Sequence, residues 1–100
     1  MNIYYKENIG LQTPQGENCD YFVLKYIGAN LITNKAEAEI LFWENLIHAQ
    51  NDKPANLSRR ILWDIVNETS VDSGINTLFT SDTITTTNEE VITLKGATIQ

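Results

Sequence analysis

Short runs of hydrophobic and β-favouring residues, separated by polar turn-forming residues, predict β-structure in the N-terminal and C-terminal parts of the chain. Residues 21–27 are largely apolar on both alternating faces, which is typical of a central strand. Residues 83–95 hold two β-favouring runs around a polar turn and predict a hairpin. β-Favouring aromatic residues predict a further strand at 3–5, and turn-forming residues predict a loop at 10–20.

The middle of the chain favours two helices. Residues 35–50 are rich in Ala, Glu and Leu, and Asn34 has the chemistry of an N-cap. Asp52 can cap a second helix over residues 53–69, and Gly74 is expected to mark its exit. Strands at both ends and helices between them are typical of an α+β protein. We expect one domain over residues 1–100, with a small antiparallel sheet (N-terminal strands plus the C-terminal hairpin) and two sequential helices packed on one face.

The second predicted helix carries an unusual group of side chains. At 100° per residue, Trp63 points almost opposite the centre of the apolar arc, with Arg59 and Arg60 on its two sides. Trp and Arg are the residues most enriched in binding hot spots, so the group predicts a partner-binding surface. In the alternative, Trp63 packs under the C-terminal segment and the arginines pair with Asp64 or Glu68.

The first predicted helix places Glu37, Glu44 and His48 on one polar ribbon. A carboxylate and an imidazole four residues apart can share a metal, but they also form an ordinary helix-stabilising pair. The chain holds one His and no second set of ligands at matched spacing, so we expect no metal site.

Catalytic chemistry finds little support in the sequence. Cys19 lies in a predicted loop and matches no catalytic spacing with His48, and one Cys cannot form an intramolecular disulfide. The five glycines are scattered, so the sequence holds no phosphate-binding loop. We expect neither an enzyme nor a cofactor.

The distribution of charge says more about the kind of partner than any motif in the sequence does. Seven Lys and Arg stand against 13 Asp and Glu, for a net charge of −6. Acid is concentrated near the C-terminus, where Asp82, Glu89 and Glu90 are candidate partner-binding residues. An acidic surface favours a protein partner with a basic surface, by electrostatic steering, over direct binding to nucleic acid.

Neither a secretory signal nor an apolar run long enough to span a membrane is apparent, so a cytoplasmic protein without membrane contact is expected. The 12 Ile and 11 Asn residues suggest, by association, a bacterial or phage source.

The leading functional hypothesis is a small acidic inhibitor or immunity-type protein that blocks a basic, nucleic-acid-handling partner by surface complementarity. Two alternatives stay open. One is an assembly subunit, such as a homodimer, that self-associates through an edge strand. The other is a regulatory domain that binds a small ligand between helices and sheet.

Overall fold

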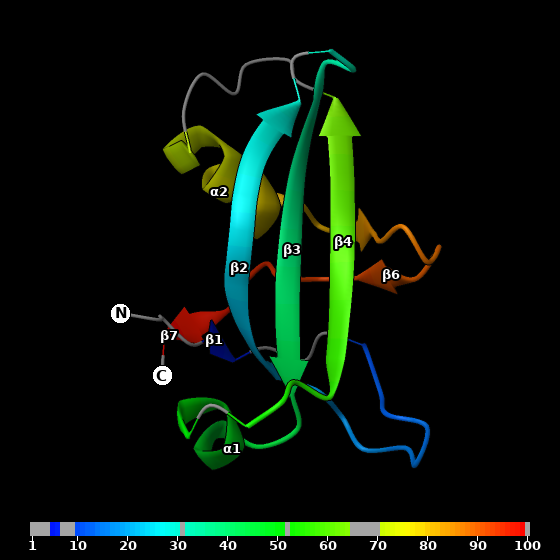
Figure 1. Cartoon of the computed structure of the whole chain (residues 1–100), viewed down its shortest axis with the longest axis vertical. Helices are drawn as coiled ribbons and strands as arrows, with labels where there is room; N and C mark the ends of the chain where they lie inside the picture. Colours follow the sequence, from blue (N-terminus) through cyan, green and yellow to red (C-terminus); the bar gives the residue numbers. More distant parts are fainter. Residues whose placement is uncertain (1–4, 7–9, 31, 52, 65–70, 100) are drawn as a thin grey trace.

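Two antiparallel sheets and two helices make up the computed structural model, which describes residues 5–6, 10–30, 32–51, 53–64 and 71–99 (Figure 1). The larger sheet has the strand order β4-β3-β2-β1-β7, and the smaller sheet is a β5–β6 pair. The α+β class and the antiparallel sheet are therefore confirmed. The strands are β1 (Tyr5–Lys6), β2 (Tyr21–Asn30), β3 (Lys35–Trp43), β4 (Leu57–Asp64), β5 (Ile84–Thr85), β6 (Val91–Ile92) and β7 (Thr98–Ile99), and the helices are α1 (Leu46–Gln50) and α2 (Val71–Thr80).

The first strand predictions hold in large part. β2 contains the whole predicted strand over residues 21–27 and is central, between β1 and β3. Tyr5 lies in β1, whereas the rest of the strand predicted at 3–5 falls outside the described residues. The loop predicted at 10–20 is present and is closed by a bridge between Gln12 and Asn18.

The helix predicted over residues 35–50 is wrong for most of its length, because residues 35–43 form β3. Its buried and half-buried residues alternate strictly up to residue 42, and the buried ones are small or apolar: Ala36, Ala38, Ile40 and Phe42. This period of two places all four on one face of the sheet, and the burial of that face outweighs the helix propensity of Ala and Glu. Only the short α1 remains helical, capped by the Asn45 side chain, which accepts hydrogen bonds from the amides of Ile47 and His48.

The helix predicted over residues 53–69 is also wrong. Residues 57–64 form β4, which pairs with β3 along its length, and residues 65–69 fall outside the described residues. The second helix comes later, as α2. Gly74 lies inside that helix, where a Cβ atom would sit 3.1 Å from Ile27 Cδ1 on β2, so its missing side chain lets the helix approach the sheet closely.

The main core lies on one face of the large sheet, called here the inner face. Phe22, Ile40 and Phe42 project from the sheet to meet Leu78 of α2 and Ile92 of β6. Figure 1 shows α2 crossing behind β2 and β3, while α1 lies at the lower end of the sheet. A smaller cluster on the other, outer face consists of Val23, Trp43 and Ala49 of α1, so the two helices contact different faces.

The C-terminal hairpin is confirmed as β5 and β6, but it forms its own small sheet. It meets the large sheet at a single bridge between Thr86 and Ile61 of β4, where the Thr87 amide donates to the Arg60 carbonyl at 2.9 Å. The hairpin therefore crosses β4 at one point rather than extending the sheet. Beyond that point the two segments diverge and leave room for a site.

Candidate functional site

β4 divides the predicted Arg59, Arg60 and Trp63 group between the two faces of the sheet. Side chains alternate along a strand, so Arg59 and Trp63 share the inner face with the buried Ile61, while Arg60 is exposed on the outer face. The prediction of one surface group is wrong because it assumed helical spacing. Trp63 packs against the main core, close to α2, and its role in partner binding stays a prediction.

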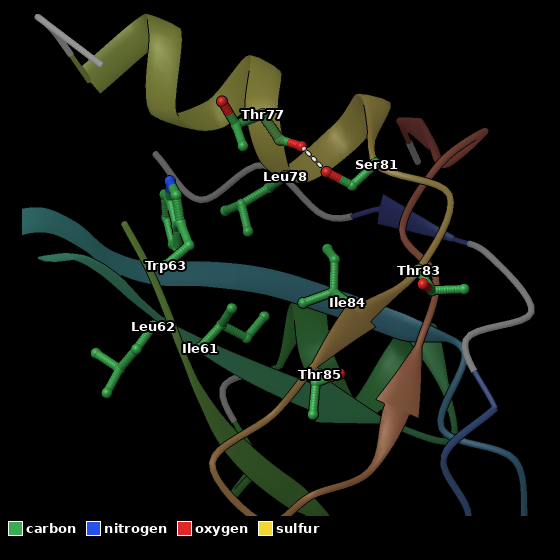
Figure 2. Close-up of a pocket in the computed structure, with 9 residues that line it drawn as sticks. All are labelled: Ile61, Leu62, Trp63, Thr77, Leu78, Ser81, Thr83, Ile84 and Thr85. Carbon is green, nitrogen blue, oxygen red and sulfur yellow. Dashed lines mark hydrogen bonds between the residues drawn. The ribbon is translucent and has the colours of Figure 1, made fainter. Parts of the chain in front are cut away.

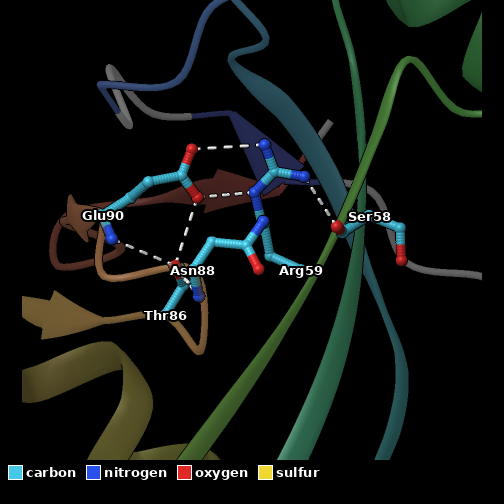
Figure 3. Close-up of polar contacts among 5 residues, drawn as sticks. All are labelled: Ser58, Arg59, Thr86, Asn88 and Glu90. Atoms are coloured by element: carbon cyan, nitrogen blue, oxygen red, sulfur yellow. Dashed lines mark hydrogen bonds and ion pairs between the residues drawn. The ribbon is translucent and has the colours of Figure 1, made fainter.

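Arg59 holds the C-terminal hairpin against β4 (Figure 3). Its Nε and Nη2 donate to the two carboxylate oxygens of Glu90 at 2.5 and 3.2 Å, and its Nη1 donates to the Ser58 carbonyl at 2.9 Å. Thr86 Oγ1 donates to Glu90 Oε1 at 3.1 Å. A two-pronged pair of this kind fixes orientation as well as distance. The suggested pairing of the arginines with Asp64 or Glu68 is thus replaced, for Arg59, by a pairing with Glu90.

The surroundings of Glu90 favour its charged form. The hydrogen bond from Arg59 is the main cause that lowers the pKa of this carboxyl below its usual value, and the Thr86 hydroxyl contributes in the same direction, while partial burial opposes both. Glu90 therefore stabilises the fold through the hairpin. This internal pairing competes with the surface role that the sequence predicted for Glu90.

The other two predicted acidic residues differ from Glu90. Asp82 is strongly exposed and accepts a hydrogen bond from Lys95 at 2.8 Å, which lowers the pKa of Asp82 and raises that of Lys95. Glu89 is exposed at the hairpin turn, in a left-handed conformation with φ of 65°. Of the three acids, Glu89 alone forms no ion pair within the part of the chain that the structure describes.

A groove opens where β4 and β5 diverge, and α2 closes it from above (Figure 2). We call it the β4–α2 groove. Nine described residues line it, and none of them is charged: Ile61, Leu62, Trp63, Thr77, Leu78, Ser81, Thr83, Ile84 and Thr85.

The groove has an apolar floor and a rim rich in hydroxyl groups. Ile61, Leu78 and Ile84 are buried at its base, while Thr83 and Thr85 are exposed at its edge. Such a groove suits a side chain whose apolar end is buried against the floor, while the atoms nearer its backbone stay in contact with water and with the hydroxyl groups of the rim.

Its size limits what it can hold. The volume of the groove is about 180 Å³, and it is partly open to solvent. Sites for drug-sized ligands usually enclose roughly 300–1,000 Å³, whereas a cavity of about 150 Å³ accommodates benzene. The β4–α2 groove therefore has the size of one bulky apolar side chain.

Of the residues that the sequence predicts for partner binding, only Trp63 lines this groove. The contribution of α2 is missed, because the sequence pattern places Gly74 at the exit of an earlier helix. The burial of β4 has the period of a strand, with Leu57, Arg59, Ile61 and Trp63 less exposed than the residues between them. The sequence carries this signal only weakly, because Arg59 is charged and Leu62 is apolar.

The residues considered for catalysis and metal binding lie in different elements and the segments between them. Glu37 is in β3, Glu44 follows β3 and His48 is exposed on α1. In the described ranges, no three His, Cys, Asp or Glu side chains are placed to hold a metal. Cys19 is fully buried, and this burial is the main cause that raises the pKa of its thiol, so little reactive thiolate is present at neutral pH.

Comparisons with protein-family models, curated proteins and solved structures gave no match to this chain. Among the described residues, no helix is long and apolar enough to cross a membrane.

Proposed function

We propose that this protein is a small, acidic, non-catalytic binding module that accepts an apolar side chain of a partner protein in the β4–α2 groove. The observation that carries the proposal is the groove itself, which has the volume of one side chain and lies beside a sheet edge. Protein interfaces commonly concentrate their binding free energy in such anchor pockets. Trp63, which lines the groove, would then be a binding residue through its inner-face contacts.

We further propose that the partner has a basic surface. In this proposal the protein acts in the cytoplasm as an inhibitor or immunity-type protein of bacterial or phage origin. The net charge of −6 supports this, because an acidic protein is steered toward a basic surface and can occupy a site meant for nucleic acid. Glu89 and Asp82 are the predicted acids best placed for this role, because Glu89 has no ion pair among the described residues and Asp82 is 86% exposed, whereas Glu90 is held by Arg59.

An affinity pull-down with mass spectrometry, at low and high salt, tests the proposal. The informative variant is Thr85→Trp, which places a large ring at the exposed rim of the groove. Thr87→Trp is the matched control, since Thr87 is exposed in the same hairpin but does not line the groove. We expect Thr85→Trp to lose a partner that the wild type and Thr87→Trp retain. Equal capture by all three proteins would show that the groove is not the binding site.

The electrostatic part is tested separately by Glu89→Lys. This change should weaken capture at low salt and have little effect at high salt, because screening removes the steering contribution. Glu90→Lys is unsuitable for this purpose, since it would also break the contact with Arg59. Light scattering on the same samples distinguishes a homodimer, and a small aromatic molecule that competes for the groove would favour the ligand-binding alternative.

A further inference from the structure

The C-terminal end of β4 adds a second feature to the groove. The Arg60 carbonyl accepts a hydrogen bond from the Thr87 amide in the hairpin, so this carbonyl points away from β3. Main-chain groups of alternate residues on a strand point the same way, so those of Leu62 and Asp64 also face outward. Beyond the Ile61–Thr86 bridge, no described strand pairs with this side of β4.

From this arrangement we infer that the partner is bound as an extended peptide segment that adds a strand to β4 at Leu62–Asp64, with one bulky apolar side chain in the β4–α2 groove and basic residues on its flanks. The inference rests on the proposed function and specifies how the partner is recognised. Strand addition of this kind obtains affinity from main-chain hydrogen bonds and specificity from pockets for alternate side chains.

The geometry of a strand pair explains why the groove and the edge belong together. A residue that joins β4 between the Leu62 carbonyl and the Asp64 amide lies opposite Trp63. Directly opposed residues project their side chains to the same face of a sheet. Trp63 projects to the inner face and lines the groove, so the opposed residue of the peptide would project into the same space.

Charge selects the flanking residues of the peptide. Asp64 directly follows the lining residue Trp63, and Asp82 lies between the lining residues Ser81 and Thr83. Their side chains are 74% and 86% exposed. Each contacts a lysine, Lys35 or Lys95, but exposed ion pairs of this kind contribute little and exchange readily. A Lys or Arg on the peptide can therefore compete for either carboxylate, whereas an acidic flank would be repelled.

The test begins with selection from a random dodecapeptide library displayed on phage, with the wild-type protein as bait and Thr85→Trp as the counter-bait. We expect enriched peptides to carry one bulky apolar residue with Lys or Arg within about three positions on either side. Alanine in place of that apolar residue should weaken binding by about tenfold or more. Failure to enrich peptides over the counter-bait, or enrichment of acidic flanks, would overturn the inference.

Two substitutions at Asp64 then separate charge from strand pairing. Asp64→Asn removes the carboxylate and should weaken an enriched peptide about threefold, at low salt only. Asp64→Pro also removes the outward amide, which an edge strand tolerates, and should weaken the same peptide about tenfold further. Circular dichroism and urea unfolding verify that both variants are folded. Equal affinities for the Asn and Pro variants would exclude strand addition.

The same variants distinguish this inference from the proposed function. If Thr85→Trp abolishes capture of the protein partner while Asp64→Pro matches Asp64→Asn, the groove binds the partner but no strand is added. If Thr85→Trp leaves capture intact, the proposed function itself is wrong. Dimer formation that depends on the same residues would show that a second copy, rather than a foreign peptide, occupies the edge.

Discussion

The two halves of β4 have the same partner on one side and different surroundings on the other. Both pair with β3 in one continuous register. In the first half the hairpin crosses the strand at Ile61, and Arg59 clamps Glu90 beside the crossing. In the second half, Leu62–Asp64, the hairpin has diverged and the β4–α2 groove has opened.

The difference shows how a small protein can hold an open site on a stable frame. Exposed strand edges are prone to unwanted pairing, and among the described residues the hairpin pairs with the β4 edge at Ile61 alone. The Ile61–Thr86 bridge and the Arg59–Glu90 ion pair hold the hairpin against β4, so the β4–α2 groove beyond them keeps its shape. We call residues 57–61 the closed half of β4 and Leu62–Asp64 the open half. The free energy of unfolding should therefore depend strongly on the closed half, and partner binding on the open half.

The largest expected effect is at Ile61, where the halves meet. Ile61→Ala should lower the free energy of unfolding by about 3 kcal/mol, because it leaves a cavity between β4, α2 and the hairpin. The neighbouring residue provides the matched control. Leu62 is 46% exposed, and Leu62→Ala should cost less than about 1 kcal/mol. Urea unfolding measures both, and equal losses would contradict the division of β4 into a closed and an open half.

Part of this organisation could be predicted from the sequence and part could not. The central strand at 21–27 and the C-terminal hairpin were predictable because their β-favouring residues agree with their final environment. β3 was not predictable, because Ala and Glu at residues 36–39 favour a helix locally, and only the burial of the Ala36 and Ala38 side chains on the inner face makes a strand better. The same error in β4 placed Trp63 and Arg59 on an outer helix surface, whereas they lie on the inner face of a sheet.

The pairing of Arg59 with Glu90 was beyond any local pattern. The two residues are 31 positions apart, and their contact depends on the hairpin crossing an edge strand at one residue. The sequence still identified both as candidates, Arg59 as a neighbour of Trp63 and Glu90 as part of the acidic C-terminal region. What the sequence lacked was the register, which decides whether a charge faces solvent or a partner within the fold.

The next largest effect is expected at Arg59. Its side chain is 17% exposed and that of Glu90 is 34% exposed. Arg59→Met should lower the free energy of unfolding by about 1–2 kcal/mol, because the carboxylate keeps its partial burial and loses its main partner. Arg60→Met is the control, since Arg60 is exposed and has no ion pair among the described residues, and it should change stability by less than about 0.5 kcal/mol. Comparable losses of stability in the two variants would mean that the Arg59–Glu90 pair contributes no more than an exposed surface ion pair.

The smallest effect is a dependence on pH that belongs to the closed half alone. The pKa of Glu90 is lower in the folded protein than its ordinary value of 4.5, so its contribution to stability is present above that value and is lost as the pH falls through the folded pKa. Glu90→Gln has no carboxylate at this position, so this pH-dependent contribution to stability is absent from the variant at every pH. The difference in free energy of unfolding between the wild type and Glu90→Gln should therefore be largest near neutral pH and shrink below about pH 4.5.

Urea unfolding of both proteins between pH 7 and pH 3 measures this difference. The pKa of Asp82 is also lowered, but Asp82 is present in both proteins and its acid-dependent loss cancels in the comparison. Glu89→Gln provides the second control, since Glu89 lies in the same turn without an ion pair among the described residues, and at neutral pH it should lower the free energy of unfolding less than Glu90→Gln does. A difference between the wild type and Glu90→Gln that does not change with pH would mean that the hairpin is held to β4 by the Ile61–Thr86 bridge and core packing, and that Arg59 contributes no charge-dependent stability to the closed half.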